Sequence, residues 1–339
     1  MANMIDVAKL AGLSLYTVSK VINGRIPVKK STRDKVQEAC RRLGYERNLY
    51  AVNLVTRTNN TIGMIVSQII NPFYGEILEA AEKTANALGY QLLCRCSYMD
   101  PAQEAAALKH FLSLKVGGII VSPVVTEENR ELLSALEMRL PVVYVDRYCN
   151  DDCHYVVNDH FQSARMVTEH LLERGASPHY LGSFQGVSSR AMLDRERGYR
   201  QAMTSSDLEP RFVRPSPGGG MDNEDYGYAS MMDHLQVEAA PEALFCATDS
   251  IAIGAMRALE ENGLRVGRDV LVAGHDDLHY SAFLNPPLTT VAQPKRHMGE
   301  EAVRAVKGLI ESGGGKPIQK TFPSQLRIRA SSLGSRVIA

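Results

Sequence analysis

Residues 5–24 read IDVAKLAGLSLYTVSKVING, which has the spacing of two short helices that cross at a tight turn. Gly12 permits the turn, and Ser14 stands where the second helix needs an N-cap. Small or apolar side chains fall where the two helices would touch: Val7, Ala8, Ala11, Leu13, Val18 and Val21. The stretch predicts a helix-turn-helix, and the alternative is an ordinary helical hairpin.

The second predicted helix offers polar and bulky residues at its exposed end, where such a helix reads DNA bases. The residues predicted to contact DNA there are Ser14, Leu15, Tyr16, Thr17, Ser19, Lys20 and Asn23. Eleven Lys and Arg residues against four acidic ones give residues 1–57 a formal charge of +7. The whole chain sums to zero, so residues 58–339 carry −7. A basic head suits binding to phosphates, and an acidic body keeps the rest of the chain off DNA.

The composition is that of a globular protein with two or three domains, at 339 residues, 45% of them hydrophobic and 22% charged. No apolar run approaches the length needed to cross a bilayer, and no signal-peptide core precedes the first helix. We therefore expect a cytoplasmic protein without a membrane partner. Cys149 and Cys153-His154 lack a second closely spaced ligand pair, so neither a metal nor a cofactor is expected.

A third helix is predicted to open at Ser31 and to end at Gly44. Residues 48–55 form a short potential helix that would be marginal without a partner. From residue 62 onward strands alternate with helices, which predicts parallel sheets covered on both faces. The predicted strands are 62–69, 91–97, 117–122, 142–146, 180–184, 243–248 and 270–274. The predicted helices between them are 73–88, 101–114, 160–174, 190–202, 249–262 and 295–311.

So many strand–helix units exceed one compact sheet, so two lobes with a cleft between them are expected. Ligands of open parallel sheets bind beyond the carboxyl ends of the strands. The acidic and polar residues expected at those ends are Ser122, Asp146, Asn158, Asp159, Thr248, Asp249 and Asp276.

The chain resembles the lactose-repressor/galactose-repressor (LacI/GalR) family of bacterial transcription regulators over its whole length. Besides the head motif, the resemblance is carried by Thr61-Ile62-Gly63, Asn71-Pro72-Phe73, Arg195-x-x-Gly198-Tyr199, Thr248-Asp249-x-x-Ala252-x-Gly254, Asp276-Asp277 and Pro287-Leu288-Thr289-Thr290-Val291. It implies an all-α helix-turn-helix head and an α/β body of two doubly wound parallel-sheet lobes, like that of periplasmic sugar-binding proteins. The implied domains are 1–47 for the head, 48–60 for a hinge helix and linker, and 61–339 for effector binding and dimerisation.

Within the body, the resemblance implies an N-lobe of about 61–159 and 291–322 and a C-lobe of about 160–290 and 323–331. The chain would cross between the lobes near residues 160, 290 and 322. The hinge helix would enter the minor groove through Asn48, Ala51 and Leu54, with the last of these wedged into a base step. Lys20 stands where the family usually has Arg, which implies softer discrimination of guanine.

The resemblance also implies an effector site made by Phe73, Asp159, Arg195, Thr248 and Asp276. Each has a simpler interpretation: Arg195 could be a surface helix residue and Asp276 a turn residue. Asp249 is expected to cap the following helix rather than to contact a ligand.

These features predict a repressor of carbohydrate-metabolism genes, controlled by a sugar or sugar phosphate bound between the lobes. A purine- or nucleoside-responsive repressor of the same fold is the alternative. One recognition helix reads a half-site, so a homodimer on a pseudo-palindromic double-stranded DNA operator is expected. No catalytic residues are expected, because the glycine runs 218–220 and 313–315 lack the spacing of a phosphate loop. A transport-type binding protein is disfavoured by the basic head.

Overall fold

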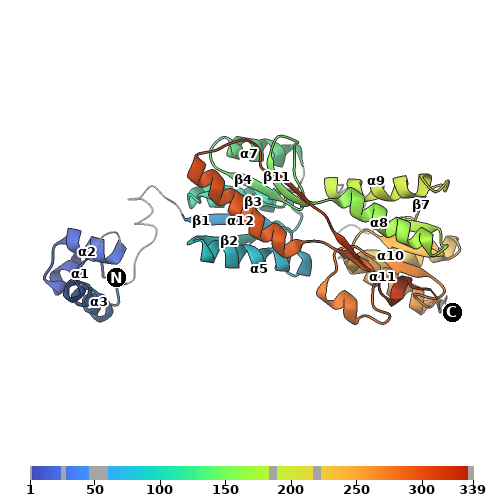
Figure 1. The fold of residues 1–339 in the computed structure, drawn as a ribbon, viewed down its shortest axis with the longest axis horizontal. Coiled ribbons are helices and arrows are strands. Elements are labelled where there is room, and N and C mark those ends of the chain that lie inside the picture. The colour runs from blue at the N-terminus through green and yellow to red at the C-terminus, as the bar shows by residue number, and fades with distance from the viewer. Residues whose placement is uncertain are drawn as a thin grey trace. The chain divides into compact units, whose positions relative to one another are not determined.

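The computed structural model describes residues 2–23, 28–45, 60–124, 126–182, 189–216 and 223–334 (Figure 1). The chain divides into two compact units, Met1–Asn59 and Asn60–Ala339. The first unit contains the residues of the predicted head, 1–47, and the second contains those of the predicted body, 61–339. The predicted hinge, with Asn48, Ala51 and Leu54, lies outside the described residues.

The head contains three described helices, α1 (Met4–Ala11), α2 (Leu15–Asn23) and α3 (Lys30–Leu43). Its core is small and is formed by one or two residues from each helix: Val7, Ala8, Val18, Val36 and Ala39. Gly12 ends α1 in the left-handed conformation, with φ 67°, as the tight turn requires. Helix α3 starts at Lys30, one residue before the predicted Ser31.

The N-lobe is built on a six-stranded parallel sheet with the strand order β11-β5-β4-β3-β1-β2. Its strands are β1 (Thr61–Val66), β2 (Gln91–Cys96), β3 (Gly118–Val121), β4 (Val142–Val145), β5 (His154–Asn158) and β11 (Gln319–Phe322). Helices α5 (Pro72–Ala87) and α12 (Lys295–Ser312) pack on one face. Helices α6 (Pro101–Ser113) and α7 (Glu127–Glu137) pack on the other. Successive residues of the central strands alternate between these two hydrophobic cores.

The C-lobe has a four-stranded parallel sheet with the order β7-β6-β8-β9. Its strands are β6 (Pro178–Leu181), β7 (Arg211–Phe212), β8 (Ala243–Cys246) and β9 (Leu271–Ala273). Its helices form two packed pairs, α8 (His160–Glu173) with α9 (Arg190–Thr204) and α10 (Asn223–Val237) with α11 (Asp249–Glu261). The second pair approaches closely at Gly254, where a Cβ atom would lie 1.9 Å from the carbonyl oxygen of Glu224.

The chain crosses between the lobes three times, from β5 to α8, from β10 (Thr290–Ala292) to α12, and from β11 to β12 (Gln325–Arg327). Strands β10 and β12 pair antiparallel beside the second and third crossings. Both sheets therefore turn the carboxyl ends of strands toward the region where the lobes meet (Figure 1). The fold class predicted from the sequence is confirmed, but α7, α10 and the strands β5, β7 and β10 to β12 were not predicted. No described helix combines the length and the apolar character needed to span a membrane.

Candidate functional site

The exposed end of α2 in the head has the form expected of a DNA-reading helix. Ser14 caps it, because its Oγ accepts a hydrogen bond from the backbone N–H of Thr17 at 3.2 Å. Leu15 and Tyr16 are 47% and 68% exposed, and the Lys20 ammonium lies 4.2 Å from the centre of the Tyr16 ring. These side chains form a surface that combines apolar area with positive charge, which suits contact with base edges and phosphates.

Not every residue predicted to contact DNA can be placed on that surface. Thr17, Ser19 and Lys20 are half-buried, so they present less of their surface than Tyr16 does, although the Lys20 ammonium reaches the Tyr16 ring. Asn23 is the last residue of α2, and its side chain lies outside the description, as do the predicted contacts of the hinge.

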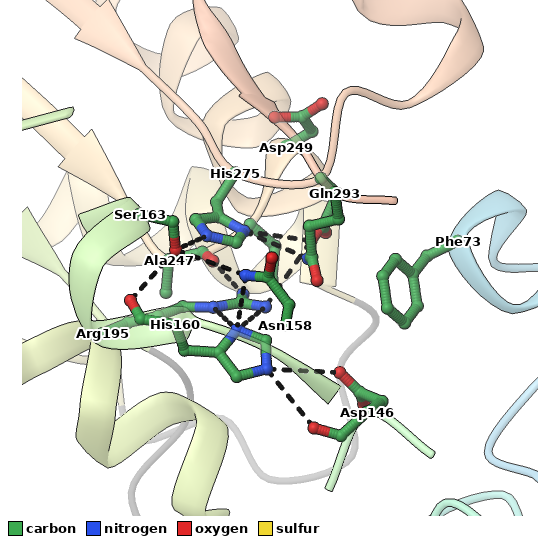
Figure 2. Close-up of polar contacts among 12 residues, drawn as sticks. Phe73, Asp146, Asn158, His160, Ser163, Arg195, Ala247, Asp249, His275 and Gln293 are labelled. Carbon is green, nitrogen blue, oxygen red and sulfur yellow. Dashed lines mark hydrogen bonds and ion pairs between the residues drawn. The ribbon is translucent and has the colours of Figure 1, made fainter. Parts of the chain in front are cut away.

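In the body, Arg195 lies at the centre of a buried polar cluster near the carboxyl ends of the C-lobe strands (Figure 2). It projects from α9 and is only 2% exposed, so its interpretation as a surface residue is wrong. Its Nη1 donates to the carbonyl oxygen of Ala247 at 2.5 Å, and its Nε and Nη2 lie 3.4 and 3.3 Å from Nδ1 of His160. Its Nη2 is also 3.7 Å from Oδ1 of Asp276, forming a buried ion pair.

Asp276 is the acidic partner in this cluster, although 81 residues separate it from Arg195. It follows β9 with φ 137°, a backbone conformation that L-residues rarely adopt, and it is 5% exposed. Gln293 donates to its Oδ1 from Nε2 at 2.6 Å. Burial raises the pKa of Asp276 to about 6, against the opposing charges of Arg195 and Lys295. The carboxyl is therefore poised to change charge near neutral pH.

Two neutral histidines complete the cluster. Burial, and then the charge of Arg195, lowers the pKa of both His160 and His275 well below the usual range. Because Arg195 donates to Nδ1 of His160, the proton of that ring is on Nε2, which donates to the carbonyl oxygen of Asp146 at 3.3 Å. Ser163 donates to the carbonyl oxygen of His160, so its Oγ is free to accept from Nε2 of His275 at 2.8 Å.

Phe73 approaches this cluster from the other lobe, as Figure 2 shows. It is the second residue of α5, whose cap Asn71 accepts a hydrogen bond from the Phe73 N–H at 3.0 Å. The ring is 4% exposed and meets the ring of Tyr74 edge to face at 5.0 Å. An aromatic ring on one lobe therefore faces a charged, hydrogen-bonding group on the other.

Thr248 and Asp249 have roles that differ from those expected. Thr248 is the N-cap of α11, because its Oγ1 accepts from the N–H of Ile251 at 3.2 Å, and the capping role predicted for Asp249 is wrong. Asp249 is fully buried and accepts hydrogen bonds from the N–H of Leu278, from Ser281 Oγ and from Thr290 Oγ1. Its carboxylate ties the start of α11 to β10, which leads into the second crossing.

Asp159 lies at the first crossing and caps α8 by accepting from the N–H of Gln162 at 2.9 Å. It lines a cavity of about 290 Å³ where the lobes meet, together with charged side chains that include Asp146, Arg190 and Arg197. The other four residues predicted to bind the effector do not line this cavity. Asp159 and the group around Arg195 are therefore two neighbouring parts of the interlobe region.

His160, Ser163 and Gln293, which position the side chains of Arg195 and Asp276, were not predicted from the sequence. Nor was a buried network in the N-lobe, in which Tyr74 donates to Oδ2 of Asp146 at 2.9 Å and Arg147 donates to Tyr74 at 2.8 Å. The one available signal was the place of these residues beside strand ends. Asp146 was predicted at such an end.

Comparison with known proteins agrees with this architecture. Residues 3–48 match the model of "Bacterial regulatory proteins, lacI family", and residues 168–332 match a "Periplasmic binding protein-like domain". The HTH-type transcriptional repressor PurR of Haemophilus influenzae is 36% identical over 308 residues, covering 89% of each chain.

Solved structures extend the likeness to the full chain. A lac repressor dimer bound to operator and the anti-inducer ONPF superposes with a TM-score of 0.87 at 28% identity, covering 98% of this chain and 99% of that one. A complex of the transcriptional regulator CelR with cellobiose has a TM-score of 0.71 at 26% identity, covering 98% of this chain and all of that one. These relatives are regulators and not enzymes, in accord with the absence of catalytic motifs from the sequence. The chain belongs to the lacI family of bacterial regulatory proteins and is a DNA-binding transcriptional repressor.

Proposed function

We propose that this repressor acts as a homodimer on a pseudo-palindromic operator and that a small polar effector bound between its lobes controls its affinity for that operator. The observation that carries the proposal is the combination, in one chain, of an exposed reading helix with a buried ion pair between Arg195 and Asp276. A single helix reads only one half-site, so a specific site of useful affinity needs two copies. The related lac repressor was solved as a dimer on its operator.

The hinge at residues 48–55 completes the DNA contact in this proposal. Asn48, Ala51 and Leu54 would enter the minor groove, and the Leu54 side chain would open a central base step. A helix this short is marginal alone, so its formation would depend on DNA and on its copy in the partner. The separation between the two hinges is then the quantity that the effector changes.

For the effector we favour a purine base or nucleoside over the sugar that the sequence first indicates. Relatives 36% identical to this chain carry the name PurR. The chemistry of the site agrees: the Phe73 ring offers a face for stacking, a carboxylate accepts N–H groups, and a guanidinium donates to ring or carbonyl acceptors. The Oε1 atom of Gln293 is buried and has no hydrogen-bond partner in the part of the chain that the structure describes, so it is a further acceptor beside Asp276.

A sugar or sugar phosphate is the second candidate, on a different observation. The interlobe cavity near Asp159 is lined by several charged side chains of both signs. Its carboxylates could accept hydrogen bonds from sugar hydroxyl groups, and its guanidinium groups could donate to a phosphate. The related regulator CelR was solved with cellobiose. The two candidates differ in which part of the interlobe region they would occupy.

The test begins with selection of duplexes from a randomised pool by the full-length protein at moderate salt. Enrichment of a two-fold-symmetric site is expected, and a failure to enrich any site, with and without the effectors below, would contradict the proposal. Fluorescence anisotropy with the selected operator then measures affinity with hypoxanthine, guanine, cellobiose or ribose 5-phosphate. A coupling of roughly 1–3 kcal/mol predicts a change of about 5- to 150-fold in operator affinity with the right class.

The test variant is Arg195→Met, which should leave operator binding intact and remove the response to the effector. The control variant is His110→Gln, an exposed substitution in the N-lobe that should change neither operator affinity nor the response. A full response in Arg195→Met would show that Arg195 does not belong to the effector site. A response to the sugars alone would favour the second candidate.

A further inference from the structure

Two histidines and a glutamate meet at the end of the C-lobe that is remote from the effector cluster. His179 is the second residue of β6, at the amino end of that strand, and His234 lies in the last turn of α10, with Glu238 just beyond it. One ligand atom from each side chain lies within 4.8 Å of the other two. His234 is fully buried, His179 is 8% exposed, and Glu238 is exposed to solvent.

Three of the four ring nitrogens of these histidines lack, among the described residues, the partners that buried polar groups normally have. Among the described residues, Nδ1 of His179 and both ring nitrogens of His234 are buried and have no hydrogen-bond partner. The buried rings of His160 and His275, in contrast, are hydrogen-bonded at both nitrogens. A buried nitrogen without a partner is costly, and a bound ion would satisfy one nitrogen of each ring.

We propose that His179, His234 and Glu238 bind a divalent transition-metal ion and that zinc is the ion that fits them best. Two imidazoles and one carboxylate are a donor set that zinc uses, with a fourth tetrahedral position left for water. Zinc–nitrogen bonds of about 2.0–2.1 Å place tetrahedral ligand atoms roughly 3.4 Å apart. Side chains within 4.8 Å of one another reach that separation by small rotations of the exposed Glu238 and of the histidine rings.

Charged groups of both signs surround the site, and the Arg211 guanidinium is the cation among them. The acidic groups that act on His179 are Glu238 and Glu242, and the second of these accepts the N–H of Ser177 at 2.8 Å. Two carboxylates near the site offset the charge of an incoming cation.

The position of the site indicates its effect. The effector cluster lies beyond the carboxyl ends of the strands, whereas His179 lies near the amino end of β6. An ion there would join the last turn of α10 to the sheet, so it would stabilise the C-lobe without contacting the effector. Cysteine spacing, on which the expectation of no metal rested, carries no information about this site. The two histidines are 55 residues apart, and only the fold brings them together.

The test uses full-length protein without a polyhistidine tag, stripped with a chelator and titrated with Zn²⁺ by calorimetry. One ion per chain is expected, with a rise in the melting temperature as Zn²⁺ is added. Glu238→Gln is the main variant because its side chain is exposed and its loss should not affect folding; it should weaken Zn²⁺ binding at least 10-fold. His179→Gln should abolish binding, and His110→Gln, in the N-lobe, should bind as the parent does.

Cobalt provides a second measurement, since Co²⁺ bound to two nitrogens and a carboxylate in a tetrahedral site has a characteristic visible spectrum. Intense absorption bands that appear on Co²⁺ addition and are absent from folded Glu238→Gln support the site. Absence of saturable Zn²⁺ binding by the stripped protein would overturn the proposal. Unchanged binding by both Glu238→Gln and His179→Gln would overturn it equally.

Discussion

Replacing Arg195 by methionine removes the cation next to the buried carboxyl of Asp276 while keeping most of the side-chain length. The substitution also removes the hydrogen bonds to Ala247 and His160. A double-mutant cycle with Asp276→Asn separates the two effects, because the loss of those hydrogen bonds is common to both backgrounds. The remaining coupling energy reports the ion pair alone.

The raised pKa of Asp276 sets the size and the pH dependence of this coupling. Breaking a buried ion pair ordinarily costs about 3–5 kcal/mol, because the remaining charge is stranded. Asp276 escapes most of that cost by taking up a proton. With a pKa of about 6, its protonation at pH 7.5 costs about 2 kcal/mol, at about 1.4 kcal/mol per pH unit. The coupling energy at pH 7.5 is therefore capped at about 2 kcal/mol.

The sign follows from the direction of the shift. The folded-state pKa lies above the unfolded value, so the folded protein binds the extra proton, and this carboxyl's contribution to the free energy of unfolding falls as the pH rises toward 6. Loss of Arg195 raises the pKa of Asp276 further and extends that fall to higher pH. At pH 5 the carboxyl is already protonated in the parent, so the coupling energy should be close to zero.

The measurement is urea unfolding of the four proteins at pH 5.0 and 7.5, followed by circular dichroism because the chain has no tryptophan. A coupling energy of about 2 kcal/mol at pH 7.5 that disappears at pH 5.0 is expected. Equal coupling at both pH values would show that the charge of Asp276 does not titrate in this range. A coupling energy below about 0.5 kcal/mol at pH 7.5 would show that Arg195 and Asp276 are not paired in solution, and either result refutes the reasoning.

Three further predictions use other parts of the molecule. Gly254→Ala places a Cβ atom 1.9 Å from a backbone oxygen of α10 and should lower the free energy of unfolding by about 2–3 kcal/mol. Gly308→Ala, whose Cβ atom would meet no described atom within 4 Å, should raise it by about 0.5–1 kcal/mol. Urea unfolding of both variants checks the packing of α10 on α11, which predicts opposite signs for the two changes. Thr248→Ala should lower the free energy of unfolding by about 1 kcal/mol because it removes the N-cap of α11, whereas Thr248→Ser keeps the hydroxyl and should lower it much less. A loss of the same size in both variants would show that the cap does not stabilise the protein. Leu54→Ala should weaken operator binding at least 10-fold in anisotropy while calorimetry finds effector affinity unchanged, and an equal loss of both would contradict the proposed division of labour.

Local signals made the head predictable from the sequence. Gly12 and Ser14 fix a turn and a cap within a few residues of each other, and both have the predicted conformations or contacts. The strand–helix alternation of the body was equally local, because central strands such as β3 and β4 are short, fully buried runs rich in Val and Ile. Edge strand β11 was missed because its residues alternate between exposed and half-buried and contain no such run. The buried face of helix α10 includes Gly227, Ser230 and His234, so a pattern of apolar residues does not mark that face.

The candidate effector site was predictable only in part, because its geometry depends on contacts between distant segments. The resemblance pointed to Arg195 and Asp276, and the structure brings them together. Nothing near Gln293 in the sequence marks it as a partner of Asp276, since their contact depends on the path of β10 beside β9. Thr248 was assigned from its place in a motif, and its capping role follows from the helix that begins one residue later.

The order in which the crossings occur along the chain has a consequence for synthesis on the ribosome. The C-lobe is almost one continuous segment, from α8 to β10, whereas the N-lobe core needs Met298, Val303 and Val306 of α12 and its sheet needs β11. Domains emerging from the ribosome fold as their residues become available. The lobe that starts first must therefore finish last: its α5 face stays uncovered while the second lobe is made. Release of a chain that stops short of α12 would leave that apolar face exposed, so α12 and β11 decide whether the first lobe is stable or is bound by chaperones and degraded by proteases.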